Sequence, residues 1–179
     1  MLALNFTPFP ILQTERLVLR QLTMSDAEDI FHHRADERVN RYLEGFSHTS
    51  IEQTRAFIEN IQKAVADNES ILWIITEKGI DKFIGSICLW NISKEEMKAE
   101  TGYTMHPDFQ NKGYMQEAMV KVIDYGFNVM KLRAIEAHTH RDNEHSIKLL
   151  IRNNFKKTIS GAVANGSENV IFVLTKTIE

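Results

Sequence analysis

One stretch near the middle of the chain constrains the fold more than any other, because a strand leads through a short polar turn into a long helical pattern. In Met115–Met130 the apolar residues recur at helical spacing, and charged and amide side chains fill the other face. This period predicts an amphipathic helix. The preceding segment Met97–His106 is typical of a strand and ends at Pro107, and Gln110–Gly113 make the turn. We therefore expect a mixed α/β fold.

The remaining segments alternate between strand and helix patterns, with no repeat or Gly/Ser-rich linker between them. Ile71–Ile75 and Phe83–Trp90 surround a polar turn that contains glycine, so we expect an antiparallel pair. Their continuous hydrophobicity predicts a sheet that is covered on both faces. The other expected strands are Glu15–Leu22, Leu132–His140, Phe155–Ser160 and Asn169–Ile178, and the other expected helices are Met24–Ala35, His48–Asp67 and Asp142–Phe155.

Polar residues at capping-box spacing mark the starts of two of these helices. Ser25 precedes Glu28 by three residues, and Ser50 precedes Gln53 by three residues. In a capping box each side chain accepts a hydrogen bond from the backbone N–H of the other residue. We therefore expect Ser25 and Ser50 to begin the first and second helices.

Composition restricts the class of protein. The 179 residues are 43% hydrophobic and 25% charged, which is typical of a globular chain, and we expect one domain over residues 1–179. A formal net charge of −3 provides no basic field, so neither nucleic acid nor an anionic membrane is an expected partner. The chain has no run of ~18 apolar residues that would predict a membrane span. Cys88 is the only cysteine, which excludes an intramolecular disulfide and fits a cytoplasmic location.

The turn before the long helix has features of an anion site. Backbone N–H groups at a helix start point in one direction, and the helix dipole adds about half a positive charge there. A single glycine such as Gly113 is also common in ordinary turns, so these residues alone indicate phosphate binding only weakly. The patterns GxxxxGK[ST] and GxGxxG are both absent, which disfavours a nucleoside-triphosphate binder.

With its flanks, the stretch "TMHPDFQNKGYMQEAM" resembles the central motif of the GNAT superfamily of N-acetyltransferases, Gln/Arg-x-x-Gly-x-Gly/Ala, in which Gln110 and Gly113 match. Four further stretches resemble the RimJ/RimL type of this family, in the same order along nearly the whole chain. The sequence departs from the family at Met115, where glycine or alanine is usual, and at Asn154, which replaces the glycine before Phe155. The four stretches are "LQTERLVLRQLTMSDAEDIF", "FIGSICLWNI", "AETGY" and "NEHSIKLLIRNNF".

The resemblance implies the GNAT fold, a mixed and mostly antiparallel sheet of six to seven strands flanked by about four helices, in the order β-α-α-β-β-β-α-β-α-β-β. It also implies transfer of an acetyl group from acetyl-CoA to a primary amine by direct attack in a ternary complex, without a metal. Backbone N–H groups of the turn would bind the pyrophosphate, and strand backbone near Met105 would bind the pantetheine arm and the acetyl oxygen. The binding residues that the resemblance implies are Tyr103, Thr104, Met105, Gln110, Asn111, Lys112, Gly113, Tyr114, Met115 and Asn143.

Two side chains are candidates for proton transfer. Glu100 lies on the strand before the turn, and we expect it to act as the base or to orient the amine. A solvated strand carboxylate is the alternative. Ser146 follows Asn143 at the family's Asn-x-x-Ser spacing and is the expected acid for the departing thiolate. A residue in the first turn of a capped helix is the alternative for Ser146.

Other reactive side chains have simpler explanations. Cys88 lies in an apolar strand, so we expect an inert buried thiol. His32 and His33 lie on the first helix, where the family places its acceptor site, and we expect a solvated pair. Metal ions are ligated by histidines in many proteins, but strand-end histidines are common and we expect no metal site. The three histidines that suggest one by their spacing are His138, His140 and His145.

The acceptor amine is not determined by these residues. A peptide or protein N-terminus is the leading acceptor, because an α-amine with a pKa near ~8 needs only a modest base. A small-molecule amine, such as a polyamine, an amino sugar or an antibiotic, is the alternative, and a non-catalytic acyl-CoA-binding module is a second class of function. We expect acceptor recognition between Ser25 and Asp67 and in the loop Gly161–Glu168. The sequence leaves a homodimer open.

Overall fold

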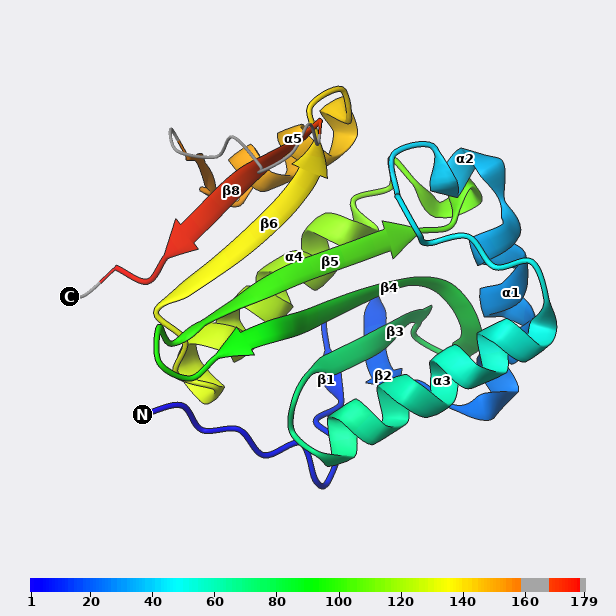
Figure 1. The fold of residues 1–179 in the computed structure, drawn as a ribbon, viewed down its shortest axis with the longest axis horizontal. Coiled ribbons are helices and arrows are strands. Elements are labelled where there is room, and N and C mark those ends of the chain that lie inside the picture. Colours follow the sequence, from blue (N-terminus) through cyan, green and yellow to red (C-terminus); the bar gives the residue numbers. More distant parts are fainter. Residues whose placement is uncertain (159–167, 178–179) are drawn as a thin grey trace.

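A computed structural model describes residues 1–158 and 168–177, and its strands form one sheet with helices on both faces (Figure 1). The strand order is β1-β2-β3-β4-β5-β6-β8-β7. The strands are β1 Leu12–Gln13, β2 Leu17–Gln21, β3 Ile71–Glu77, β4 Ile80–Ser93, β5 Lys98–Met105, β6 Ala134–His140, β7 Lys156–Lys157 and β8 Asn169–Thr175. The helices are α1 Ala27–Ala35, α2 Glu37–Asn40, α3 Ile51–Ala66, α4 Tyr114–Asp124 and α5 Glu144–Arg152.

The predicted fold class is confirmed, since the sheet is mixed and mostly antiparallel. Within the described chain the sheet has eight strands in place of six to seven, because the two-residue strand β1 pairs with β2. The short helix α2 was not predicted either. The expected acceptor loop Gly161–Glu168 lies outside the described residues, apart from Glu168. Among the described helices, none has the length and apolar character needed to cross a membrane.

Two apolar clusters cover the two faces of the sheet, as the continuous hydrophobicity of β3 and β4 predicted. Trp73 and Ile75 of β3 belong to the larger cluster, which also contains residues of α4 and α5. Ile74, between them, belongs to the smaller cluster beneath α1 and α3. Figure 1 shows α3 in front of β3, while α4 lies on the opposite face, behind β5.

The start of α1 differs from the prediction. A 3₁₀ turn precedes the helix, and its capping box is formed by Thr23 and Asp26 and not by Ser25 and Glu28. The backbone N–H of Thr23 donates to Oδ2 of Asp26 at 2.8 Å. Arg20 of β2 donates to both oxygens of the same carboxylate, at 2.9 and 2.7 Å. This tertiary ion pair places the carboxylate of Asp26, and the local pattern around Ser25 contained no sign of it.

The other helix predictions are confirmed, with one change in geometry. Ser50 caps α3, and its Oγ accepts a hydrogen bond from the N–H of Gln53 at 3.2 Å, whereas Oε1 of Gln53 accepts from the N–H of Thr49 and not from that of Ser50. The long pattern Met115–Met130 is divided into α4 and a π-helical turn, Tyr125–Val129. Gly126 in this turn packs closely on the start of β6, since a Cβ there would lie 3.1 Å from Cδ1 of Ile135.

The central feature of the sheet is the divergence of β5 and β6. These parallel strands pair at only three positions, of which the last joins Glu100 to Glu136. Beyond that point β5 continues along β4 as far as Met105, and β6 continues along β8 as far as His140. The strands separate into a V-shaped gap that opens toward the tips of both arrows in Figure 1. The sheet therefore consists of two antiparallel halves joined at one end.

The Arg20–Asp26 pair gives a testable pH dependence of stability. Burial opposes ionisation of Asp26, but hydrogen bonds from Arg20 and Thr23 outweigh it and lower the pKa of the carboxyl below its usual 3.8. The folded state therefore binds this proton less readily than the unfolded chain does. The stabilisation is complete above pH ~4 and is lost as the pH falls through the lowered pKa.

We expect Asp26→Asn to reduce the free energy of unfolding at pH 7 by ~2–4 kcal/mol, because it weakens a buried ion pair and the cap. Urea unfolding followed by circular dichroism at pH 7 and pH 3 measures this, and the loss should be smaller at pH 3. Asp67→Asn, in an exposed pair with Lys63, is the control and should change little. Equal losses at both pH values would contradict the account.

Candidate active site

The register of β5 determines which backbone groups face the gap. The N–H of His106 donates to the carbonyl of Ile84 on β4 at 2.8 Å. In an antiparallel pair such bonds alternate along the strand, so Thr104 also directs its backbone toward β4, while Tyr103 and Met105 direct theirs toward the gap. The β5 edge therefore directs two N–H groups away from β4, toward the side on which β6 diverges.

A buried hydroxyl marks the closed end of the gap. Thr101 is the first residue of β5 beyond the last pair with β6, and its Oγ1 is buried without a hydrogen-bond partner in the described chain. Polar atoms that are buried in this way are uncommon and suggest a partner that the protein alone does not provide. The unpaired strand edge and this hydroxyl fit a linear ligand with amide groups.

The turn at the open end of the gap aims the start of α4 at the same space. Asn111 and Gly113 have positive φ angles of 59° and 78°, and Gly113 is the N-cap of α4. Glycine adopts this conformation without steric strain. Gln110 Nε2 donates to the carbonyl of Met105 at 3.1 Å, which fixes the turn to the end of β5. Gln110, Asn111, Lys112 and Gly113 are all exposed and accessible to an anion.

The segment just before β2 fixes this turn by hydrogen bonds, and we call Thr14, Arg16 and Glu117 the clamp. Arg16, next to β2, donates from Nη1 to the carbonyl of Lys112 at 3.0 Å and from Nε to Glu117 of α4 at 2.8 Å. The backbone N–H of Arg16 and the hydroxyl of Thr14 also donate to Glu117. Burial opposes ionisation of Glu117, but these bonds lower its pKa. The clamp holds the first turn of α4 in place.

The side chains of Tyr114 and Met115, which follow Gly113, point away from the backbone N–H groups of the preceding turn. The hydroxyl of Tyr114 donates a hydrogen bond to Glu77 of β3. The Cζ of Arg16 lies over the Tyr114 ring, 4.5 Å from the ring centroid. Met115, where the family pattern has glycine or alanine, is partly buried and packs against the larger core cluster. Its side chain is therefore directed toward the core.

Helix α5 is joined to β5 by a pair of hydroxyl groups. Asn143 is the N-cap of α5, and its Oδ1 accepts a hydrogen bond from the N–H of Ser146 at 3.2 Å. Ser146 Oγ lies 2.6 Å from the hydroxyl of Tyr103, which reaches across from β5. Burial raises the pKa of Tyr103 to about 12, so this phenol is neutral and able to donate. Gln116 and Asn153 exchange two hydrogen bonds of 2.9 Å that join α4 to α5.

Glu100 lies on the α1 and α3 face of β5, at the closed end of the gap. Burial raises its pKa, while His138 and a hydrogen bond with Asn91 oppose the rise and the charge of Glu136 adds to it. Lys98 Nζ lies 3.2 Å from the carboxylate of Glu136 and compensates that second charge. A half-buried carboxylate with a raised pKa is a stronger base than a solvated one.

Small and polar side chains of β4 and β5 form a floor beside Glu100 on this face. Gly102 lies opposite Cys88 in the register, and a Cβ on Gly102 would come within 3.3 Å of the Cys88 Sγ. Burial raises the pKa of that thiol to about 12, so it is not a thiolate nucleophile. Trp90, opposite Glu100, is 47% exposed. The floor is thus open to an acceptor molecule.

His33 of α1 forms a wall of this space and corrects an expectation. It is buried, and not part of a solvated pair, because its ring packs on Phe83 and its Nε2 lies 2.9 Å from Oγ1 of Thr104. Burial lowers the pKa of His33 to about 4, so the ring is neutral at pH 7. His32 is exposed, as expected.

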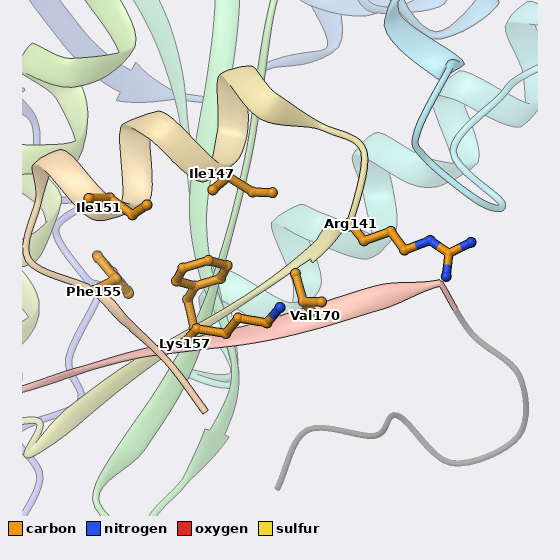
Figure 2. A pocket seen from close by; sticks show the side chains of 7 residues that line it. Arg141, Ile147, Ile151, Phe155, Lys157 and Val170 are labelled. Carbon is orange, nitrogen blue, oxygen red and sulfur yellow. The ribbon is translucent and has the colours of Figure 1, made fainter. Parts of the chain in front are cut away.

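A hollow outside the gap lies between α5 and β8 (Figure 2). Its volume is about 260 Å³, its lining is mainly apolar, and it contains none of the expected site residues. Near it, His140, Asp142 and Glu168 bring potential metal ligands within 4.8 Å of one another. The carboxylate of Glu168 is already paired with His140 at 2.8 Å and with Arg141 at 2.6 Å. This cluster is a surface network that consists of a His140–Glu168 hydrogen bond and an Arg141–Glu168 ion pair.

Residues 16–156 match the sequence profile of the acetyltransferase (GNAT) domain. The chain is also 36% identical over 149 residues to the uncharacterized N-acetyltransferase YoaA of Bacillus subtilis (strain 168), which covers 83% of this chain and 84% of that protein. The chain belongs to the GNAT family. This GNAT protein is accordingly an acetyl-CoA-dependent N-acetyltransferase.

Two solved GNAT structures share the fold. RimL, a ribosomal-protein alpha-N-acetyltransferase in complex with coenzyme A, has a TM-score of 0.80 and 18% identity, covering 93% of this chain and 98% of that one. The microcin C7 self-immunity acetyltransferase MccE, in complex with acetyl-CoA and AMP, has a TM-score of 0.77 and 19% identity, covering 90% and 93%. At these identities the likeness concerns the fold alone.

The sequence did not reveal the clamp around Glu117. Thr14 and Arg16 lie in a stretch that resembles the family, but they have the pattern of an ordinary edge strand, and their partners are about a hundred residues away. A contact of such sequence separation has no local signal. The one indication in the sequence was Glu117 itself, which lies in the first turn of the helix with the clearest pattern. A negative charge there interacts favourably with the helix dipole.

The clamp gives a second prediction. Glu117→Gln should weaken CoA binding by roughly 5- to 30-fold, because a positioning contact of ~1–2 kcal/mol no longer holds the turn. Isothermal titration calorimetry with CoA measures this. The matched control is Lys148→Ala, which removes an exposed pair on α5 and should leave the affinity within twofold. Unchanged affinity in folded Glu117→Gln would show that the clamp does not position the turn.

Proposed function

We propose that this enzyme acetylates the amine of a peptide or protein N-terminus by direct attack on acetyl-CoA in a ternary complex. The observation that carries the proposal is the gap between β5 and β6, which has donor groups along one edge and Glu100 at its closed end. An acyl-thioester arm along the β5 edge would extend from the turn at Gln110–Gly113 toward Glu100. The acceptor would approach over the floor formed by β4 and β5.

Cofactor binding is assigned to the backbone of this edge and turn. The N–H groups of Asn111 to Met115 would face the pyrophosphate, where fixed peptide dipoles and the start of α4 stabilise negative charge. The N–H groups of Tyr103 and Met105 would bind the pantetheine arm in the manner of an added strand. The Nδ2 of Asn143, which has no partner among the described residues, would donate to the same arm.

The chemistry requires two proton transfers. The amine nitrogen attacks the acetyl carbonyl carbon, so that an N–C bond forms and the C–S bond breaks. Glu100 accepts the proton that the amine releases, and Ser146 donates a proton to the departing thiolate, with Tyr103 as its hydrogen-bonded neighbour. An N–H of the β5 edge stabilises the negative charge that develops on the acetyl oxygen.

An α-amine suits this site better than a lysine side chain does. An α-amine has a pKa near ~8 and is partly neutral at pH 7, whereas a lysine amine near ~10.4 needs a stronger base. Glu100, even with a raised pKa, remains a modest base. The fold of RimL, which is named as an acetyltransferase of protein α-amines, is compatible with this acceptor class.

Substitution at Glu100 and Ser146 tests the assignment. Glu100→Gln and Ser146→Ala should each lower kcat by ~10²–10⁴-fold, as expected for loss of a general base or acid, and leave CoA affinity within a few fold. Thiol release from acetyl-CoA over a panel of N-terminal peptides, polyamines and aminoglycosides measures turnover. Tyr103→Phe should give an intermediate loss, and Glu59→Gln on the exposed face of α3 is the control.

The dependence of kcat/KM on pH tests whether Glu100 acts as the base. Only ionised Glu100 accepts a proton, so kcat/KM, corrected for the ionisation of the amine, should rise with pH through a pKa above the usual 4.5. Glu100→Gln should abolish this rise. Full turnover in the Glu100→Gln, Ser146→Ala double variant would refute the catalytic assignment, and turnover of polyamines alone would refute the acceptor class.

A further inference from the structure

One row of side chains joins Glu100 to the far edge of the sheet. Glu100 of β5 pairs with Glu136 of β6, which pairs with Val173 of β8, which pairs with Lys156 of β7. Direct partners in a sheet project from the same face, so all four side chains lie on the α1 and α3 face. Neighbouring strands are ~4.8 Å apart, which places Val173 ~10 Å and Lys156 ~14 Å from Glu100 along the row.

Apolar side chains remain uncovered beside this row. Phe172 of β8 belongs to the larger core cluster, on the side of α5, whereas Ile171 and Val173 on either side of it belong to neither core cluster. Both are only partly buried. Among the described helices, α3 lies in front of β3 in Figure 1, and none lies in front of β6 or β8. We call His138, Ile171, Val173 and Lys156 the β6–β8 face.

Two other directions away from Glu100 are obstructed. At the open end of the gap, the segment from α1 to the loop after α2 contacts both strands. Nε2 of His33 lies 2.9 Å from Oγ1 of Thr104 on β5, and the ring of Tyr42 packs on that of His140 on β6, with centroids 5.3 Å apart. On the side of β4, the next strand, β3, lies beneath α3 in the smaller core cluster. The β6–β8 face, by contrast, is open to a chain that starts at Glu100.

The charges along the row favour an acidic group beyond Val173. Nζ of Lys98 lies 3.2 Å from the carboxylate of Glu136 and compensates its charge. Lys156 is exposed and forms no hydrogen bond or ion pair within the part of the chain that the structure describes. The uncompensated charge at the far end of the row is therefore positive, and it attracts a carboxylate.

We propose that the β6–β8 face binds the N-terminal segment of a polypeptide acceptor as it leaves the reaction centre. The amine lies at Glu100, apolar side chains at the third and fourth residues pack on Val173 and Ile171, and an acidic fifth residue pairs with Lys156. These positions follow from a rise of ~3.3 Å per residue in an extended chain. The inference rests on the proposed function and deepens it, because it identifies the interaction surface and the kind of polypeptide that fits it.

Binding of bisubstrate conjugates of different length tests this without requiring turnover. In each conjugate the CoA sulfur is joined through a –CH₂–CO– group to the nitrogen of the first residue. The acceptors are alaninamide, Ala-Ala-Val-Val-Glu-Ala-amide and a twin of the latter with Gln in place of Glu. Calorimetry should show that the six-residue conjugate binds ~5–20-fold more tightly than the alaninamide conjugate, because burial of ~60 Å² of apolar surface corresponds to about a tenfold change in affinity. The Gln twin should bind ~2–5-fold more weakly than the Glu conjugate, as expected for loss of an exposed ion pair.

Variants assign these preferences to the β6–β8 face. Val173→Ser should weaken binding of the six-residue conjugate by roughly 3- to 10-fold and leave the alaninamide conjugate within twofold, because only the longer chain reaches Val173. Lys156→Glu should remove the preference for Glu over Gln. The control is Ile151→Asp on α5, where the side chain is 59% exposed and lines the hollow on the other face of β8, and it should change neither preference. If Val173→Ser does not fold, the wild type and Lys156→Glu still decide the matter.

Three results would overturn the proposal. The first is equal affinity for the alaninamide and six-residue conjugates in the wild type. The second is a preference for length that Ile151→Asp removes and Val173→Ser retains, which would place the chain in the hollow of Figure 2. The third is a dimer in sedimentation equilibrium that Val173→Ser converts to a monomer, which would assign the face to a second copy of this chain. Failure of CoA alone to bind would instead refute the proposed function itself, so the two failures are distinguishable.

Discussion

The separation of β5 from β6 is the constraint on which the rest of the site depends. Two antiparallel half-sheets are joined by three parallel residue pairs, and each strand is bound on its other side, β5 by β4 and β6 by β8. Beyond Glu100 on β5 and Glu136 on β6, the two strands no longer pair with each other. The hydrogen bonds between Gln116 and Asn153 hold α4 and α5 together beneath it. The gap is thus a stable property of the sheet.

Because the gap is fixed, the functional groups around it need little further support. The β5 edge provides backbone donors on one side, and the clamp from Arg16 to Glu117 holds the start of α4 at the open end. On the α1 and α3 face, Glu100 lies beside a floor of small residues of β4 and β5. Preorganised dipoles and charges of this kind require no rearrangement when the substrate binds.

The sequence predicted what depends on local period and missed what depends on distant partners. Strands, long helices and the turn at Gly113 follow from hydrophobic spacing and from the order of family motifs. The capping box at the start of the first helical segment is formed by Thr23 and Asp26 and not by Ser25 and Glu28, because Arg20, on another element, binds Asp26. The burial of His33 depends on the packing of α1 against β4 and β5, which the local sequence pattern does not show.

Backbone NMR with CoA tests the central claim most directly. If CoA lies between β5 and β6 with its pyrophosphate at the start of α4, the amide signals of Met105, Gly113 and Tyr114 should shift most on titration, and those of α3 should stay nearly unchanged. Largest shifts around Ile151 and Val170, which line the hollow between α5 and β8, with Met105 and Gly113 unmoved, would contradict the account.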